Sequence, residues 1–261
     1  MVDYPASELL PLVYKHFPEQ LNNNDNCIAK TLHRDIQCIN TSTPVNKKHH
    51  IITPNITKQL NLLIENLGSE YYDKLGDRMY GIKAEQHNDC DRKWIDYKID
   101  EMTQTNGLIY VSYYYNCDGD GNNKTESNNS LAFYCSFLLT DEDYSGTDIA
   151  GANTHRRHYT RSTGEIPKII YLYELQISKN FQSLGYGSSI ILNWLTNVLK
   201  DYTGVDGRSN NKSIQLTCFS TNHKALHFYY NKCGFIKIAE EEKECYPDDD
   251  QPIYFILKHS I

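Results

Sequence analysis

The stretch Phe181–Leu195, FQSLGYGSSIILNWL, decides the fold, because it sets two glycines between a run typical of a strand and a run typical of a helix. A glutamine and the two glycines are spaced as Gln182-x-x-Gly185-x-Gly187. Beyond them, apolar residues recur every three to four positions over 190–199, as on the buried face of a helix. A helix start carries unpaired amides and a partial positive charge, and glycine lets an anion approach them. The stretch therefore predicts either a plain tight turn or a loop that holds a phosphate group.

The residues on both sides of this stretch predict a mixed α/β domain. Apolar residues at intervals of three to four predict helices, and alternating or short continuous apolar runs predict strands. The expected helices are 6–16, 55–74, 91–102, the segment after the glycines, and 222–232. The expected strands are 27–39, 107–115, 130–140, 169–177, 213–219, 235–239 and 253–258, with 107–115 and 130–140 joined as a hairpin. In this order a central strand, 169–177, meets a helix start through the glycine loop.

Composition narrows the class of protein. The chain has 261 residues, a net charge of -7 and no apolar run of the roughly 18 residues that a membrane helix needs. It also lacks the basic excess of a nucleic-acid binder. Its eight cysteines are scattered singly and its start lacks a secretory signal pattern, which favours reduced thiols in the cytoplasm and nucleus. We expect a monomer with one domain over 55–261, on which an irregular and helical segment, 1–54, packs.

Two motifs in a fixed order connect the glycine loop to a known family. The loop is followed, about 35 residues later, by a second motif and then by a Gly-Phe pair: Asn222-x-x-Ala225-x-x-Phe228-Tyr229 and Gly234-Phe235. Together they resemble the GNAT superfamily of acetyl-CoA-dependent N-acetyltransferases. The resemblance implies a GNAT fold, in which a mixed, mostly antiparallel sheet is flanked by helices, here with an added helical N-terminal part. It also implies acetyl-CoA as co-substrate and no metal.

Within that superfamily the chain resembles the NatD family, which acetylates the N-terminal amine of histone tails that begin Ser-Gly-Arg-Gly. The matching segments are Tyr171-Leu172-Tyr173-Glu174-Leu175-Gln176, Leu216-Thr217-x-Phe219-x-x-Asn222-His223, and Asp100-Glu101-Met102-Thr103 after Trp94. An extra residue between Tyr229 and Gly234 is a further match. The similarity covers roughly 55–258. It is interrupted by long polar insertions at 116–129 and 141–167 and is weak before residue 55.

The resemblance assigns the coenzyme to one loop and two strand ends. The residues that it nominates are Leu175, Gln176, Ile177, Gln182, Ser183, Leu184, Gly185, Tyr186, Gly187, Ser188, Thr217, Asn222 and Tyr229. The glycine loop would hold the pyrophosphate, and the backbone of 175–177 would pair with the pantetheine arm. Asn222 is also a good helix N-cap, which alone could explain it. Either Tyr229 or Tyr230, or neither, would return a proton to the departing thiolate.

Glu174 is the candidate general base, with Tyr171 and Tyr173 beside it. It lies in the middle of an apolar strand, where loss of water would favour its protonated form and bring it into the range of an α-amine. Period-two alternation puts Glu174 on the face opposite the two tyrosines. We therefore expect a strand bulge or an intervening water if all three are to meet the amine. A carboxylate simply turned outward remains the alternative.

For the peptide, the resemblance nominates a set of aromatic residues and one acid, in which core packing could equally account for each aromatic. They are Tyr71, Trp94, Tyr173, Tyr254 and Asp141, with Asp143 as a substitute for Asp141. Aromatics can wall a slot for small first residues, and a carboxylate can pair with an arginine at the third position. Cys218 could in principle form an acyl-enzyme, but direct attack in a ternary complex is preferred. Transfer to lysine side chains or a polyamine, and a non-catalytic CoA-binding module, remain competing functions.

Overall fold

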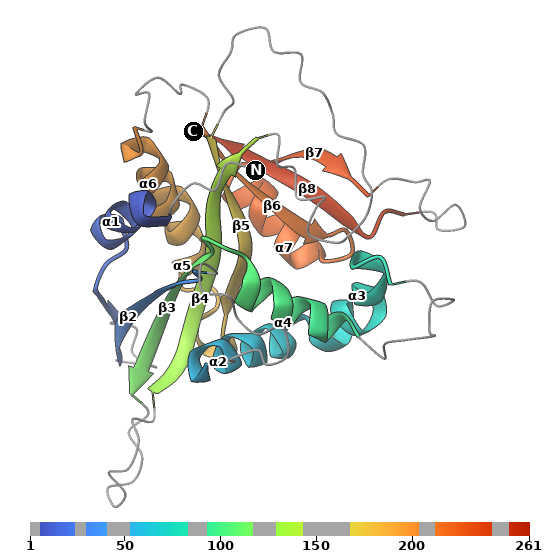
Figure 1. Cartoon of the computed structure of the whole chain (residues 1–261), viewed down its shortest axis with the longest axis horizontal. Helices are drawn as coiled ribbons and strands as arrows, with labels where there is room; N and C mark the ends of the chain where they lie inside the picture. Colours follow the sequence, from blue (N-terminus) through green and yellow to red (C-terminus); the bar gives the residue numbers. More distant parts are fainter. Residues whose placement is uncertain are drawn as a thin grey trace, which may run out of the picture.

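The computed structural model describes residues 6–23, 30–40, 53–82, 93–116, 129–142, 168–203, 212–241 and 251–261 (Figure 1). Most of the two polar insertions, and with them Asp143, lie outside the described residues. No helix in the described part is both long and apolar enough to cross a membrane.

One eight-stranded sheet organises the chain. Its order is β1-β2-β3-β4-β5-β6-β8-β7, and every neighbouring pair is antiparallel except β5 and β6. The strands are β1 (Gln20–Asn23), β2 (Lys30–Cys38), β3 (Ile109–Asn116), β4 (Asn129–Asp141), β5 (Lys168–Ile177), β6 (Ser213–Phe219), β7 (Ile236–Glu240) and β8 (Tyr254–Ser260). The predicted architecture, a mixed and mostly antiparallel sheet flanked by helices, is confirmed, as is the β3–β4 hairpin.

Helices cover both faces of the sheet. They are α1 (Ala6–His16), α2 (Pro54–Leu63), η1 (Ile64–Tyr72), α3 (Asp73–Met79), α4 (Trp94–Gln104), η3 (Lys179–Phe181), α5 (Tyr186–Ser188), η4 (Ser189–Leu195), α6 (Thr196–Asp201), α7 (His223–His227) and η5 (Phe228–Lys232). Figure 1 shows α1 beside α6 on one side of the sheet and α2 with α4 on the other. Buried side chains of α1 and η4 share one core cluster, and those of α2 and α4 share a second. We call these sides the α1 face and the α2 face.

Before residue 55, the described segments join the same domain. α1 packs Leu9 and Val13 into the core of the α1 face, and β2 pairs with β3 along six residue positions. β1 was not predicted, because its four residues, QLNN, carry no apolar alternation; it is held at the sheet edge by backbone pairing with β2. The division of the chain at residues 54 and 55 stays a prediction.

The helix predicted over 55–74 continues through α3 to Met79, and Gly76 explains how α3 can pack against α4. A Cβ built on Gly76 would lie 2.7 Å from both Cβ and Cγ of Trp94. We therefore expect Gly76→Ala to destabilise the protein by about 1–3 kcal/mol, as overpacked core positions do. Urea unfolding measures this. Lys74→Ala, an exposed change on the same helix, is the control and should stay within about 0.5 kcal/mol. Equal stability of the two variants would contradict the close packing.

Candidate active site

β5 separates from β6 part-way along its length. The two strands run parallel and pair from Ile169 with Ser213 to Leu172 with Leu216. Past Leu172, β5 continues to Ile177 in register with β4, while β6 continues to Phe219 in register with β8. The site residues predicted from 173 to 177 therefore lie where the ladder between the two central strands has ended, and the glycine loop follows directly.

A bulge in β5 decides where Glu174 points. Leu172 pairs with Phe137 and Glu174 pairs with Ser136, so Tyr173 is an extra residue in the ladder. Leu172 belongs to the core of the α1 face, and strict alternation would turn Glu174 to that side. Instead, Tyr173 packs on the α2 face and Glu174 reaches α4 on the same side. The ring of Tyr173 also contacts that of Tyr171, with centroids 5.2 Å apart. The expected bulge is thus present, and it puts all three side chains on the same face of the sheet.

Glu174 is buried, as expected, but charged and polar groups surround its carboxylate. Its Oε1 forms an ion pair with Nζ of Lys98, and its Oε2 accepts a hydrogen bond from Nε2 of Gln176 at 2.7 Å. Gln176 in turn accepts one from Nδ2 of Asn66 at 3.0 Å. Lys98 also pairs with Glu101. The apolar surroundings expected for this carboxyl group are therefore replaced by a lysine ammonium and an amide donor.

Two hydroxyls next to Glu174 have no hydrogen-bond partner within the described part of the chain. They belong to Ser136, directly opposite Glu174 in the ladder, and to Tyr134, opposite Gln176. Both residues are at most 1% exposed. Buried polar atoms are nearly always paired in folded proteins. These two unpaired hydroxyls, next to the Glu174 carboxylate, could therefore hydrogen-bond a polar group of a bound substrate.

The two glycines of the loop serve different purposes. Gly185 has φ +84° and caps the helix that begins at Tyr186, and a Cβ on it would meet nothing within 4 Å. Gly187 lies against another element, since a Cβ there would be 3.0 Å from Cζ of Phe228. Gly187 is thus explained by packing. Gly185 leaves open space in front of the first helix amides, where a phosphate group fits.

Gln182 ties the loop to the strand before it and the helix after β6. Its Nε2 donates to the carbonyl of Ile177 at 2.9 Å, and its Oε1 accepts from Nζ of Lys224 at 2.8 Å. Ser183 has φ +66° and, like Leu184 and Gly185, is exposed. The segment 182–188 therefore forms a braced, solvent-facing loop at a helix start, which fits a coenzyme pyrophosphate.

Neither the protein-family models nor the curated proteins gave a match to this sequence. The solved structures that match are only weakly similar to this chain. Arabidopsis thaliana NAA60 in complex with a bisubstrate analogue is 10% identical, with a TM-score of 0.41, over 87% of this chain and 99% of its own. Arabidopsis thaliana Naa50 with the bisubstrate analogue CoA-Ac-MVNAL is 13% identical, with a TM-score of 0.37, over 87% and 99%. A GNAT-family acetyltransferase from Listeria monocytogenes is 12% identical, with a TM-score of 0.39, over 93% and 99%. At these TM-scores, the function has to be inferred from the residues of this chain.

The remaining residues assigned to the coenzyme have partners of their own. Thr217 hydrogen-bonds through its hydroxyl to that of Tyr171, across the point where β5 and β6 separate. Asn222 accepts from the amide of Ala225 at 3.1 Å, so the N-cap alone accounts for it. The ring of Tyr229 lies between those of Phe228 and Phe235. Burial, with the neighbouring Cys218 and Glu174, raises the pKa of Tyr229 well above its usual value. The choice between Tyr229 and Tyr230 stays open.

The aromatic residues assigned to the peptide fall into two groups. Tyr71 stacks on Phe219 with centroids 5.5 Å apart, and Tyr254 pairs with Phe219 in the β6–β8 ladder, so both lie at the end of β6. Trp94 is only 8% exposed, stacks on Tyr72 and donates from Nε1 to Asp73. Packing between α3 and α4 accounts for Trp94. Its role in binding a peptide stays a prediction, as do those of Tyr71, Tyr173 and Tyr254.

The structure does not bring Asp141 to Glu174. Asp141 forms an ion pair with Lys168 at the start of β5, six residues before Glu174 and therefore about 20 Å away along the strand. Asp141 is two residues after Leu139 and so points to the same face, the α1 face, whereas Glu174 points to the α2 face. The third residue of a peptide whose amine lies at Glu174 does not reach Asp141 from there, because two extended residues span only about 7 Å.

Sequence reasoning did not assign a function to Lys98, Glu101 or Asn66. Lys98 and Glu101 are three residues apart in a helix, a spacing that indicates an ion pair. That both side chains turn toward β5 depends on the packing of α4 against the sheet, which no local pattern encodes.

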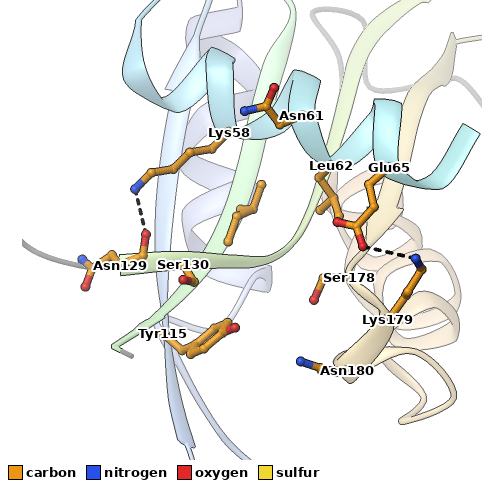
Figure 2. Close-up of a pocket in the computed structure, with 11 residues that line it drawn as sticks. Lys58, Asn61, Leu62, Glu65, Tyr115, Asn129, Ser130, Ser178, Lys179 and Asn180 are labelled. Atoms are coloured by element: carbon orange, nitrogen blue, oxygen red, sulfur yellow. Dashed lines mark hydrogen bonds and ion pairs between the residues drawn. The ribbon is translucent and has the colours of Figure 1, made fainter. Parts of the chain in front are cut away.

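A cavity of about 500 Å³ lies between α2, the end of β3, the start of β4 and the segment after β5 (Figure 2). Figure 2 shows Lys58 and Asn129 joined at one end and Glu65 and Lys179 at the other, with polar side chains between them. Glu174, Lys98 and the residues of the glycine loop do not line it. The cavity is therefore separate from the candidate active site.

Cys218 is unsuited to an acyl-enzyme. Burial raises its thiol pKa to about 12, so the nucleophilic thiolate is scarce at any physiological pH. We expect Cys218→Ala to keep turnover within about threefold of the wild type. Intact-mass spectrometry of the wild-type protein after incubation with acetyl-CoA should show no added acetyl group on the enzyme. An acetyl adduct that disappears in Cys218→Ala would contradict direct attack.

Proposed function

We propose that the protein transfers the acetyl group of acetyl-CoA to the α-amine of a peptide N-terminus, with Glu174 as the general base. The observation that carries the proposal is the bulge at Tyr173. It turns a buried carboxylate to the side of two tyrosines on the strand that leads into the glycine loop. A phosphate-binding loop and a proton acceptor on one strand are what acyl transfer from a nucleotide-linked thioester requires.

Each residue of this site has a definite part in the transfer. Acetyl-CoA supplies an activated acetyl group as a thioester, and the amides of 185–188 would hold its pyrophosphate. Glu174 takes one proton from the α-ammonium of the peptide, so that the nitrogen lone pair can form the new N–C bond as the C–S bond breaks. The nitrogen then loses its second proton, and the departing thiolate takes up a proton to leave as the CoA thiol. An α-amine has a pKa of about 7.7–8.0, so part of it is already deprotonated near neutral pH and the base has to remove a proton only from the remainder. The hydroxyls of Ser136 and Tyr134 can form hydrogen bonds with the polar groups at the N-terminus of the peptide.

We further propose that the substrate is a histone tail that begins Ser-Gly-Arg-Gly, and that the protein acts in the cytoplasm and nucleus. The support for the substrate is the likeness of the segments 171–176 and 216–223 to the NatD family. The aromatic cluster of Tyr71, Phe219 and Tyr254 at the end of β6 is a suitable wall for small first residues. Asp141 does not support this choice, because Lys168 already pairs with it.

The test is acetylation of a peptide that begins Ser-Gly-Arg-Gly and carries lysines further along. Mass spectrometry after incubation with acetyl-CoA should find one acetyl group, on the first residue. The same peptide with a formylated N-terminus is the control and should gain none. Acetylation of the lysines in the blocked peptide would replace N-terminal transfer by a lysine acetyltransferase activity. Binding of acetyl-CoA without any transfer to peptides or polyamines would leave a CoA-binding module.

A further inference from the structure

Lys98 of α4 is buried between two carboxylates. Its side chain is 3% exposed, and its Nζ forms ion pairs with Oε1 of Glu101 and Oε1 of Glu174. The two acid side chains are 10% and 7% exposed. Burying three charges is costly, and an apolar replacement is often as stable, so a buried ion pair is weak evidence for a role in stability alone. The location, in contact with the candidate base, points to a role in the chemistry.

The cluster carries one more acid than base. Although burial opposes its charge, the two carboxylates raise the pKa of Lys98 well above its usual value. Burial, partly offset by Lys98, raises the pKa of Glu101. The other titratable groups that face the cluster are tyrosines of η1, β3, β4, β5, η5 and the end of α3, whose pKa values burial raises: Tyr72, Tyr110, Tyr134, Tyr171, Tyr229 and Tyr80. They stay neutral at physiological pH, so a proton that enters the cluster can rest only on a carboxylate.

The contacts also fix the orientation of Glu174. Lys98 forms an ion pair with Oε1, Gln176 donates to Oε2, and Gln176 itself accepts from Asn66 of η1. On the far side, Tyr80 donates to Oε2 of Glu101 at 3.4 Å. Glu101 therefore competes with Glu174 for the same ammonium from a fixed position.

We propose that Lys98 is a positioning residue for Glu174, the base in the function proposed above, on which this inference rests. Lys98 keeps the Glu174 carboxylate charged and aimed, and Glu101 limits how strongly it does so, which leaves Glu174 able to accept a proton. The two partners thus act on Glu174 in opposite directions. A lysine that only fills space or stabilises the fold would give no such opposition.

Two variants separate these effects. Glu101→Gln keeps an oxygen for Lys98 and Tyr80 but removes the competing charge, so the acid limb of the pH–rate profile should move down by about half a unit or more. The double variant K98M/E101Q removes one charge of each sign and leaves Glu174 without its cation. Its acid limb should move up by about one unit. Asp100→Asn, on the same helix, alters a carboxylate that bonds Gln104 and should leave the profile unchanged.

NMR of protein labelled with ¹³C at the glutamate carboxyl carbons measures the same titration without turnover, and Glu174→Gln assigns the signal. Opposite displacements of the Glu174 titration in the two variants support the inference. Displacements of the same sign, or none, overturn it, even if both variants lose activity. Opposite displacements in a wild-type protein that acetylates no peptide would overturn the proposed function but retain the charge-holding role of Lys98.

Discussion

Glu174→Gln is expected to lower turnover with a peptide substrate by about 100-fold or more, because general-base catalysis contributes roughly 10²–10⁴. The change removes the proton acceptor but keeps the shape of the side chain. The amide oxygen can still accept from Lys98, whose charge remains paired with Glu101, so no buried cation is left alone. Steady-state kinetics with saturating acetyl-CoA measure the effect as a loss in kcat.

Coenzyme affinity separates this role from a structural one. The glycine loop lies beyond the end of β5 and contacts Ile177 rather than Glu174, so the Kd for acetyl-CoA should stay within about twofold in Glu174→Gln. Glu65→Gln, an exposed carboxylate on η1 that pairs with Lys179, is the matched control and should leave kcat unchanged. Turnover of Glu174→Gln equal to that of the control would remove Glu174 from the role of base.

Most strands of the sheet could be predicted from the sequence, because each is an apolar run that can be recognised from neighbouring residues alone. It also predicted that Glu174 could join Tyr171 and Tyr173 only if the strand were irregular. The position of the bulge follows from the register of β5 against β4, in which Phe137 pairs with Leu172 and Ser136 with Glu174. Register depends on residues far apart in the chain, so only the structure could establish it.

The chemistry around Glu174 was less predictable. An apolar strand suggested that water is excluded from the carboxylate, and it is. The partner that offsets the cost of that burial, Lys98, lies on a helix 76 positions earlier in the chain. Asp141 is the opposite case, since its position along the sequence is like that of the NatD family, but in the structure it lies on the other face of the sheet. The local pattern thus singled out Glu174, whereas its electrostatic environment depends on the packing of α4.

Gly185→Ala is expected to weaken acetyl-CoA binding tenfold or more. Gly185 has φ +84°, and the space in front of its α-carbon is open. A methyl group would occupy that space, in which the pyrophosphate would approach the helix amides. The left-handed backbone would also cost about 1–2 kcal/mol of stability in alanine. Isothermal titration calorimetry measures the Kd, and thermal unfolding measures the stability.

Gly234 provides a matched control for the backbone strain. Its φ is +69°, and a Cβ on it would make only an ordinary contact, 3.9 Å from Nδ1 of His259. Gly234→Ala should therefore lose a similar amount of stability and still bind acetyl-CoA like the wild type. Both variants introduce the same backbone strain, but only Gly185 lies in the glycine loop. A loss of acetyl-CoA affinity in Gly185→Ala alone therefore comes from a change in that loop. Equal affinities in both variants would mean that Gly185 serves the turn alone and that no phosphate binds in front of it.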